Sequence, residues 1–422
     1  MTRTRAHTAA LLVLLSASCF SAACGDEPPQ RAGFDAEALK RLDSIERDNQ
    51  SLRDRLKSLE SARDDADEGE LADDETGQGL SARYGNLRVA FQLFSDVGFK
   101  YQNRPEAGTA NTNFAFGSID FFTTAQLGDH LQVAAETVLE GSGDDVGLDQ
   151  ERLYAQYTFN DALYVKTGLE HTLVSRWNRL YHHGKWLELA IERPLQARFE
   201  DDAGFLPMHY VGIELGGRWS SGVGTLEYRG IVSNGRGPSP EDRQRVSDIN
   251  DSKALEGSLA LQPICAPNLS LGGAFRYEDV AGDDDATAAA PDQTTRQAIG
   301  SGFLQWKRGP IDVLGEVAVM GDRDAASGGH STHVSAYLQA GYRIGAFTPY
   351  ARFDFADMEN GDPYLAPAES DNDKWEQLFG VRYDFADQAA LKLELGTGRR
   401  EDSTSGDRDW FYSVATQLAW FF

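Results

Sequence analysis

The sequence has few cysteines and few basic residues, and each shortage excludes a class of protein. Three cysteines, Cys19, Cys24 and Cys265, occur among 422 residues, which is too few for a disulfide framework. Lys and Arg number 40 against 66 Asp and Glu, for a net charge of −26. A nucleic-acid binder needs a basic face that displaces counterions from phosphates, so we expect no nucleic-acid partner. We assign no function to Cys265.

Long hydrophobic runs are also missing. Beyond Leu15, no stretch offers the roughly 18 consecutive apolar residues that a membrane-spanning helix needs, and the mean hydropathy is −0.45. A bundle of membrane-spanning helices is therefore excluded. Glycine, by contrast, is plentiful at 42 residues, and aromatic residues make up 10% of the chain.

The N-terminal residues read as an export signal. Arg3 and Arg5 precede the apolar run Ala9 to Leu15, and small residues follow as far as Ala23, which is typical of a secretory signal peptide over residues 1–23. The next residue, Cys24, follows Ser-Ala-Ala, in a pattern that resembles a lipoprotein processing site. Cys24 is therefore a candidate for lipidation, and the alternative is ordinary signal cleavage that discards it.

A linker over 24–34 leads into a heptad repeat over 35–62. Its a and d positions are Leu42, Ile45, Asn49, Leu52, Leu56 and Leu59. Such a seam predicts a coiled coil that oligomerises the chain, and an Asn at an a position typically fixes register and strand number. The alternative is a solitary amphipathic helix. Residues 63–83 are strongly acidic, so we expect an extended, solvated linker.

From residue 84 onward the hydrophobic pattern changes to period two. Apolar side chains alternate with polar or charged ones in Leu87–Leu93, Leu131–Glu136 and Leu391–Leu395. Successive side chains of a strand point to opposite faces, so each strand has one apolar face and one charged face. A soluble sandwich would bury the apolar face, whereas a membrane barrel would turn it outward to lipid.

The connections between these segments favour the barrel. About sixteen candidate strands are joined alternately by short turns, such as 127–129 and 308–309, and by longer acidic connections. The longer connections include 141–148, 169–205, 280–294, 322–331 and 400–408. Short turns at one end and long loops at the other are typical of outer-membrane barrels. The sequence thus predicts an all-β protein: a transmembrane antiparallel barrel of about sixteen strands over 84–422, preceded by the short coiled coil.

The last predicted strand carries the most specific signal. Trp410, Tyr412, Leu418, Trp420 and Phe422 share one face, and the sequence stops on Phe422. Here the chain resembles Gram-negative outer-membrane porins of the sixteen-stranded type, and the hairpin 152–168 more weakly resembles phosphate-selective (O and P type) porins. The resemblance implies passive diffusion, a homotrimer in the outer membrane with its coiled coil in the periplasm, and Phe422 as the insertion signal read by the barrel-assembly machinery. Lipid and lipopolysaccharide are further expected partners, with peptidoglycan a candidate.

Residues 169–205 form the longest connection and hold enough aromatic and aliphatic residues to pack. Uncommitted loops of this length are usually functional or disordered, and we predict that this one folds into the barrel and narrows the pore. The predicted constriction residues are Arg176, Arg179, Lys185, Glu188, Glu192, Arg193 and Arg198. The predicted pore-wall residues, which occupy inward positions of the strands, are Arg88, Glu136, Arg152, Arg276, Arg352 and Arg382.

Phosphate selectivity does not fit the outer connections. Asp283, Asp284 and Asp285 would repel anions at the mouth of the barrel and attract cations, including divalent ions that bridge to lipopolysaccharide. General or weakly cation-leaning diffusion is the better expectation.

A metal site and an active site are both disfavoured by the sequence. His171, His182, His183 and His209 lack a zinc-type spacing, so we expect no metal ion and no cofactor. No Gly-x-Ser-x-Gly or phosphate-binding glycine motif is present, so we expect no enzymatic activity. Two alternatives stay open beside the porin: a structural envelope tether with a plugged barrel, and an outer-membrane enzyme on a barrel scaffold.

Overall fold

The computed structural model describes most of the chain from residue 71 onward. The described residues are 71–73, 80–103, 112–142, 145–182, 184–198, 205–238, 247–248, 251–281, 295–359, 361–362, 364–365, 371–402 and 408–422. The predicted signal peptide 1–23, Cys24, the linker 24–34, the coiled coil 35–62 with its seam, and most of the acidic linker lie outside the described residues. Those interpretations stay predictions.

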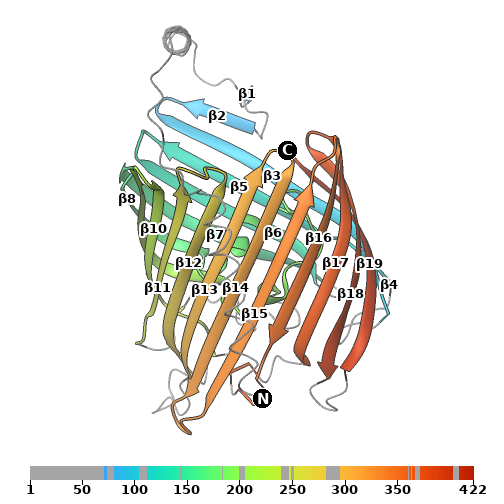
Figure 1. Cartoon of the computed structure of the whole chain (residues 1–422). Coiled ribbons are helices and arrows are strands. Elements are labelled where there is room, and N and C mark those ends of the chain that lie inside the picture. Colours follow the sequence, from blue (N-terminus) through green and yellow to red (C-terminus); the bar gives the residue numbers. More distant parts are fainter. Residues whose placement is uncertain are drawn as a thin grey trace, which may run out of the picture.

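Sixteen antiparallel strands form a closed barrel (Figure 1). They are β3 (Leu87–Gln102), β5 (Ser118–Leu127), β6 (Leu131–Ser142), β7 (Asp145–Asn160), β8 (Leu163–His171), β9 (His209–Ser221), β10 (Gly224–Ser233), β11 (Ala254–Pro263), β12 (Leu269–Val280), β13 (Thr295–Arg308), β14 (Ile311–Asp324), β15 (His330–Tyr342), β16 (Phe347–Asp357), β17 (Asp371–Ala386), β18 (Ala389–Asp402) and β19 (Arg408–Phe421). Each strand pairs with the next along the chain. The predicted antiparallel barrel of about sixteen strands is confirmed.

The barrel closes between its first and last strands. β19 pairs with β3 from Ser413 opposite Gln102 to Phe421 opposite Phe94. Beyond them, the backbone of Phe422 exchanges two hydrogen bonds with Leu93, of 2.9 and 3.0 Å. Closure removes the unpaired edges that an open sheet would present.

Three short strands extend the sheet beside the barrel wall. β2 (Leu80–Tyr84) pairs with the first residues of β3, and β1 (Leu71–Asp73) pairs with β2. β1 lies within the predicted acidic linker 63–83, and β2 begins in it and ends one residue beyond it. Figure 1 places β2 at the same end of the barrel as the C-terminus. β4 (Thr112–Ala115) pairs with the far end of β3.

The side chains are arranged inside out relative to a soluble protein. In β18, Leu391, Leu393 and Leu395 are 46%, 42% and 50% exposed, whereas the charged Lys392 and Glu394 between them are 0% and 2% exposed. An outward apolar face and an inward polar face are typical of a barrel that spans a membrane. Among the described residues, no helix has the length and apolar character that a membrane span requires.

The strands run further into the longer connections than the sequence indicated. The connections predicted at 141–148, 322–331 and 400–408 are reduced to 143–144, 325–329 and 403–407, because the flanking strands continue into them. These three predictions of longer loops were therefore wrong: turn-forming and acidic residues there lie within paired strands. The large loop occupies 172–208, three residues later than the predicted 169–205, since β8 continues to His171 and β9 starts at His209.

Candidate functional site

The large loop runs over residues 172–208, and its described parts, 172–182, 184–198 and 205–208, lie inside the barrel. Its described residues form a short helix, α3 (Arg176–Tyr181), and a 3-10 turn, η1 (Leu195–Ala197). The loop forms hydrogen bonds or ion pairs with side chains of β3, β9, β11, β14, β16, β17 and β18.

The first part of the loop is held by one carboxylate of the opposite wall. Glu316 on β14 accepts hydrogen bonds from the backbone amides of Arg176, at 2.8 Å, and Trp177, at 2.7 Å. Ser175 caps the same helix, because its Oγ accepts from the amide of Asn178. The first amides of a helix have no partner within it, so a buried carboxylate of the wall satisfies them and fixes where the helix starts. Tyr337 donates a further hydrogen bond of 2.6 Å to Glu316.

Two more carboxylates hold the second part of the loop. Glu394 on β18 accepts from the amides of Ile191, at 3.0 Å, and Glu192, at 3.2 Å. Asp354 on β16 accepts from the amide of Leu195 at 3.2 Å. Buried peptide groups must find partners, and here the barrel wall supplies them.

Cationic side chains of the wall bind the carbonyl groups of the loop. Arg352 donates to the carbonyl oxygens of Glu192, at 2.6 Å, and Arg193, at 2.9 Å. Arg382 donates to the carbonyl of Glu188 at 3.0 Å and also to that of Trp186. Lys392 also binds two loop carbonyls: its Nζ donates to the oxygen of Lys185 at 2.6 Å and to that of Ala190 at 3.4 Å. The predicted pore-wall residues Arg352 and Arg382 thus anchor the loop.

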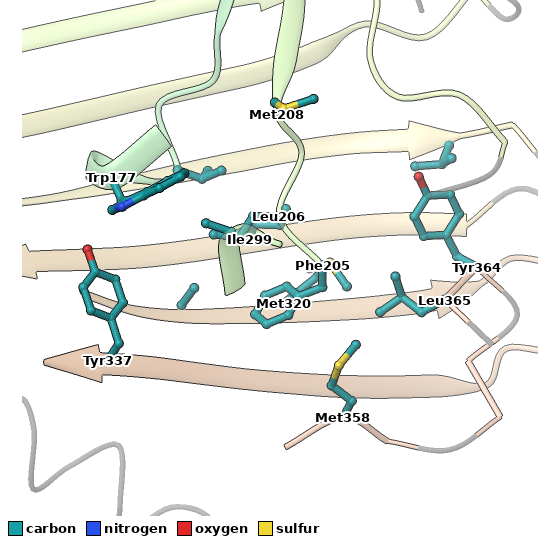
Figure 2. Close-up of a cluster of buried hydrophobic side chains, with 14 of the residues drawn as sticks. Trp177, Phe205, Leu206, Met208, Ile299, Met320, Tyr337, Met358, Tyr364 and Leu365 are labelled. Carbon is teal, nitrogen blue, oxygen red and sulfur yellow. The ribbon is translucent and has the colours of Figure 1, made fainter. Parts of the chain in front are cut away.

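Apolar packing adds to these polar contacts. Trp177, Phe205 and Leu206 of the loop are buried against Ile299 of β13 and Met320 of β14 (Figure 2). This part of the inner wall is apolar, so the loop covers surface that would otherwise face the lumen. Burial of such side chains stabilises the inward position of the loop.

Three other predicted wall residues, Glu136, Arg152 and Arg276, belong to two ion-pair networks. Arg152 on β7 binds Glu136 and also Glu170, whose Oε1 lies 2.9 Å from the Arg152 Nε; Lys166 binds the same Glu170 at 2.9 Å.

The second network centres on Arg276, on β12. It is buried between Glu278, at 2.6 Å, and Glu256. Glu256 also accepts a 2.8 Å hydrogen bond from the amide of Leu173, at the start of the loop. Buried charges such as those of Arg276 and its two glutamates need pairing of this kind.

Arg88, the remaining predicted wall residue, lies outside both networks. It is exposed, opposite Arg83 of β2.

Three of the predicted constriction residues make contacts with the wall or within the loop. Arg198 pairs with Glu376 on β17, and Glu192 pairs with Lys100 on β3 at 3.0 Å. The Arg193 guanidinium lies 6.0 Å from the ring centroid of Trp177. These three side chains fix the loop to the wall or to itself.

Lys185 and Glu188 lie next to Lys392. Both are in the stretch of loop whose carbonyls bind Arg382 and Lys392, and Glu188 is buried there. Burial is the main cause that raises the pKa of the Glu188 carboxyl, against the opposing effect of Lys185.

Arg176 and Arg179 line a recess between the large loop and the wall strands β10 to β14. Glu227 and Arg229 of β10 and Glu316 of β14 contribute to the same recess. Arg229 and Glu227 form an ion pair of 2.5 Å, and Arg179 contacts Glu214 at 3.4 Å. The recess therefore presents both signs of charge, with arginine on the side of the loop.

Several residues that hold the loop were missed by the sequence analysis. Glu316 and Glu376 were not among the predicted wall residues. Both side chains are buried on the inner face of the barrel. In β14, Glu316 lies between Gly315 and Val317, which occupy outward positions. The alternation of β14 could have identified Glu316 as inward, but not its role.

No family model and no curated protein matches the sequence. The structure is similar to an anion-selective porin from Comamonas acidovorans, with a TM-score of 0.57, 14% identity, and coverage of 80% of this chain and 100% of that chain. It is also similar to the outer-membrane channel DcaP of Acinetobacter baumannii, with a TM-score of 0.57, 11% identity, and coverage of 82% and 100%.

A third similar structure is Salmonella typhi OmpF, determined in complex with daunomycin. The TM-score is 0.53 at 10% identity, with coverage of 80% of this chain and 98% of that chain. At identities this low, the structural similarity establishes the fold alone. The chain has the fold of the Gram-negative outer-membrane porins, a closed barrel of sixteen antiparallel strands.

Proposed function

We propose that this protein is an outer-membrane porin that lets small hydrophilic solutes or ions diffuse passively through its barrel, and that it is not an enzyme. The observation that carries the proposal is the large loop. Wall carboxylates bind its amides and wall cations bind its carbonyls, while leucines and aromatic side chains face outward. A barrel of sixteen strands encloses more space than its own side chains fill, and the loop narrows that space.

The charges at the recess favour polar over apolar solutes. Arg176, Arg179 and Arg229 stand beside Glu227 and Glu316. Opposed charges along a passage create a local field that favours hydrated, dipolar solutes, whereas a ring of one sign selects ions of the other sign.

Single-channel recording in planar bilayers tests the proposal. We expect stepwise current increments when the purified protein inserts, and none from heat-unfolded protein at the same concentration. Insertion without any open-channel current would contradict diffusion and favour a plugged barrel that acts as an envelope tether. Turnover of a substrate by a channel-silent barrel would favour the enzyme alternative.

The oligomer is a second part of the proposal. The heptad seam of Leu42, Ile45, Asn49, Leu52, Leu56 and Leu59 supports a periplasmic coiled coil that joins three copies. Deletion of 35–62 is expected to shift the protein in detergent from trimer toward monomer, measured by light scattering after size-exclusion chromatography. An unchanged mass per particle would show that this segment does not hold the copies together.

Further partners follow from the outer-membrane location. Outer lipid and lipopolysaccharide would surround the apolar wall, and the barrel-assembly machinery would read Phe422. Lipidation of Cys24 and contact of the N-terminal segment with peptidoglycan would fix the barrel to neighbouring layers of the envelope.

A further inference from the structure

Four buried side chains that can bind a metal ion converge where the large loop joins the barrel wall. They are Glu151 on β7, His171 at the end of β8, His209 at the start of β9, and His182 directly after α3. Each offers one ligand atom, and these atoms all lie within 4.8 Å of one another. The four side chains are 0% to 8% exposed.

The fold explains why residues so far apart in the sequence meet. His171 and His209 are direct partners across the β8–β9 ladder. In β7, Arg152 pairs with Glu136 and Gln150 pairs with Thr137, so Glu151 is the extra residue of a bulge. Bulges commonly re-aim a side chain next to a functional site.

The distances suit a small tetrahedral ion. Glu151 Oε2 lies 2.6 Å from His209 Nε2, 3.5 Å from His182 Nε2 and 3.8 Å from His171 Nε2. Zinc bonds to nitrogen and oxygen of about 2.0–2.1 Å place tetrahedral ligands about 3.4 Å apart. Two of the three separations are within half an ångström of that value, and the shortest has to widen.

We propose that Glu151, His171, His182 and His209 bind a divalent transition-metal ion, with Zn²⁺ as the best match. Three imidazoles and one carboxylate are ligands that suit Zn²⁺, whereas Mg²⁺ and Ca²⁺ prefer sites made of oxygen atoms. The ring centroids of His171 and His182 lie 4.9 Å apart and those of His171 and His209 lie 5.0 Å apart, so the rings already converge from three sides.

One present contact has to change when the ion binds. Arg152 Nη2 lies 2.8 Å from His171 Nδ1, and because arginine only donates, Nδ1 accepts in this arrangement. Ligation through Nε2 moves the ring proton to Nδ1, and Arg152 Nη2 turns away. Arg152 keeps its hydrogen bonds to Glu136 and Glu170 through its other two nitrogens.

The ion would join the loop to the wall. Glu151, His171 and His209 belong to wall strands, whereas His182 belongs to the loop. A bound ion would therefore fix the position of the segment that follows α3. The site itself rests on the geometry of these four residues, and only its effect on conductance rests on the proposed function.

The test uses the full chain without a polyhistidine tag, in detergent, after treatment with a chelator. We expect calorimetric titration to show one Zn²⁺ per chain that excess Mg²⁺ does not displace, and Co²⁺ to show the intense visible absorption of a four-coordinate ion. The double variant His182→Ala/His209→Ala should bind at least about 100-fold more weakly, since loss of mere supporting partners already costs 10–100-fold.

Two matched variants control for other histidines. His130→Ala removes an exposed histidine outside the cluster, and His333→Ala removes the histidine of a second buried group with Asp322 and Asp362. Both should keep the binding of the wild-type protein.

Several results would overturn the site. These are a wild-type protein that binds no Zn²⁺, a Co²⁺ spectrum of the hydrated six-coordinate ion, or binding abolished by His333→Ala alone. If the double variant does not fold, the Co²⁺ spectrum of the wild-type protein still shows whether a four-coordinate site is present. Failure here would leave the single-channel current of the proposed porin unchanged, so the two proposals fail separately.

Discussion

Arg198 of the large loop and Glu376 of β17 form a two-pronged ion pair inside the barrel. Arg198 Nη1 donates to Glu376 Oε1 at 3.0 Å, and Nη2 contacts Oε2 of the same carboxylate. Both side chains are buried. Two-pronged pairs of this kind are among the stronger and more directional contacts in proteins, so this pair fixes the second half of the loop to the wall.

Replacement of Glu376 by Ala should loosen the loop. It leaves Arg198 buried without its carboxylate, and removal of one partner of a buried pair costs about 3–5 kcal/mol. We expect larger fluctuations of the open-channel current and faster proteolysis within the loop. The control is Asp312→Ala, which breaks a 3.0 Å ion pair with Lys307. The side chain of Asp312 is 38% exposed and that of Lys307 is 52% exposed, so loss of this pair should cost about 1 kcal/mol or less. Equal noise in both variants would contradict an anchoring role for Glu376.

Removal of the arginines at the recess should change ion selectivity. Arg176→Ala/Arg179→Ala takes two positive charges from the loop side, while Glu227 and Glu316 remain. The reversal potential in a salt gradient should therefore shift in the direction that indicates greater selectivity for cations. Arg343→Ala removes the same type of charge from an exposed turn and should leave the potential unchanged. A reversal potential that the double variant does not move would exclude Arg176 and Arg179 from the ion path.

Acid should release the contact between Glu192 and Lys100. Burial raises the pKa of the Glu192 carboxyl, but Lys100 and Arg198 outweigh this and lower the pKa to about 2. A carboxyl whose pKa is lowered by folding stabilises the folded arrangement fully above its ordinary pKa, here 4.5, and loses that contribution as the pH falls through the lowered value.

Current noise in the wild-type channel should therefore rise between about pH 4.5 and about pH 2. Glu192→Gln lacks the titrating carboxyl and serves as the reference, because the other carboxylates of the lumen titrate in both proteins. The noise at pH 6 should already be higher in this variant. Identical pH profiles for the two proteins would refute the assignment.

Phe422 combines two roles that variants can separate. Its backbone exchanges two hydrogen bonds with Leu93 at the closure of the barrel, and its side chain is proposed as the insertion signal. Phe422→Ala keeps the backbone bonds, so refolding in detergent should match the wild-type protein while the amount inserted in cells falls. Deletion of Phe422 should impair both. A normal level of Phe422→Ala in the outer membrane would remove the side chain from insertion.

The strands were predictable because their signal is local. In β18, Leu391, Leu393 and Leu395 alternate with Lys392 and Glu394 in the sequence, and the structure turns the two sets to opposite faces. Period-two alternation needs only the pleat of a strand. The strand number followed from counting such segments. The ends of β6, β14 and β18 did not follow, because pairing with a neighbouring strand extends a strand past acidic and turn-forming residues.

The candidate site was predictable only in outline. The length and aromatic content of the large loop indicated that it would pack, but nothing in the sequence paired Arg176 with Glu316, 140 positions away. The sequence also showed no sign that Arg198 and Arg352, two arginines predicted to lie along the pore, make contacts between the loop and the wall.

Sequence alone determined the barrel, its count of about sixteen strands and the presence of a long loop able to pack, because these depend on the periodicity and spacing of neighbouring residues. Only the tertiary structure decided which wall residues hold the loop and that His171, His182 and His209 meet beside Glu151. Closure of the barrel sets the distances across its lumen and along its ladders. A bulge in β7 and a helix in the loop then bring together side chains whose separation in the sequence carries no sign of the contact.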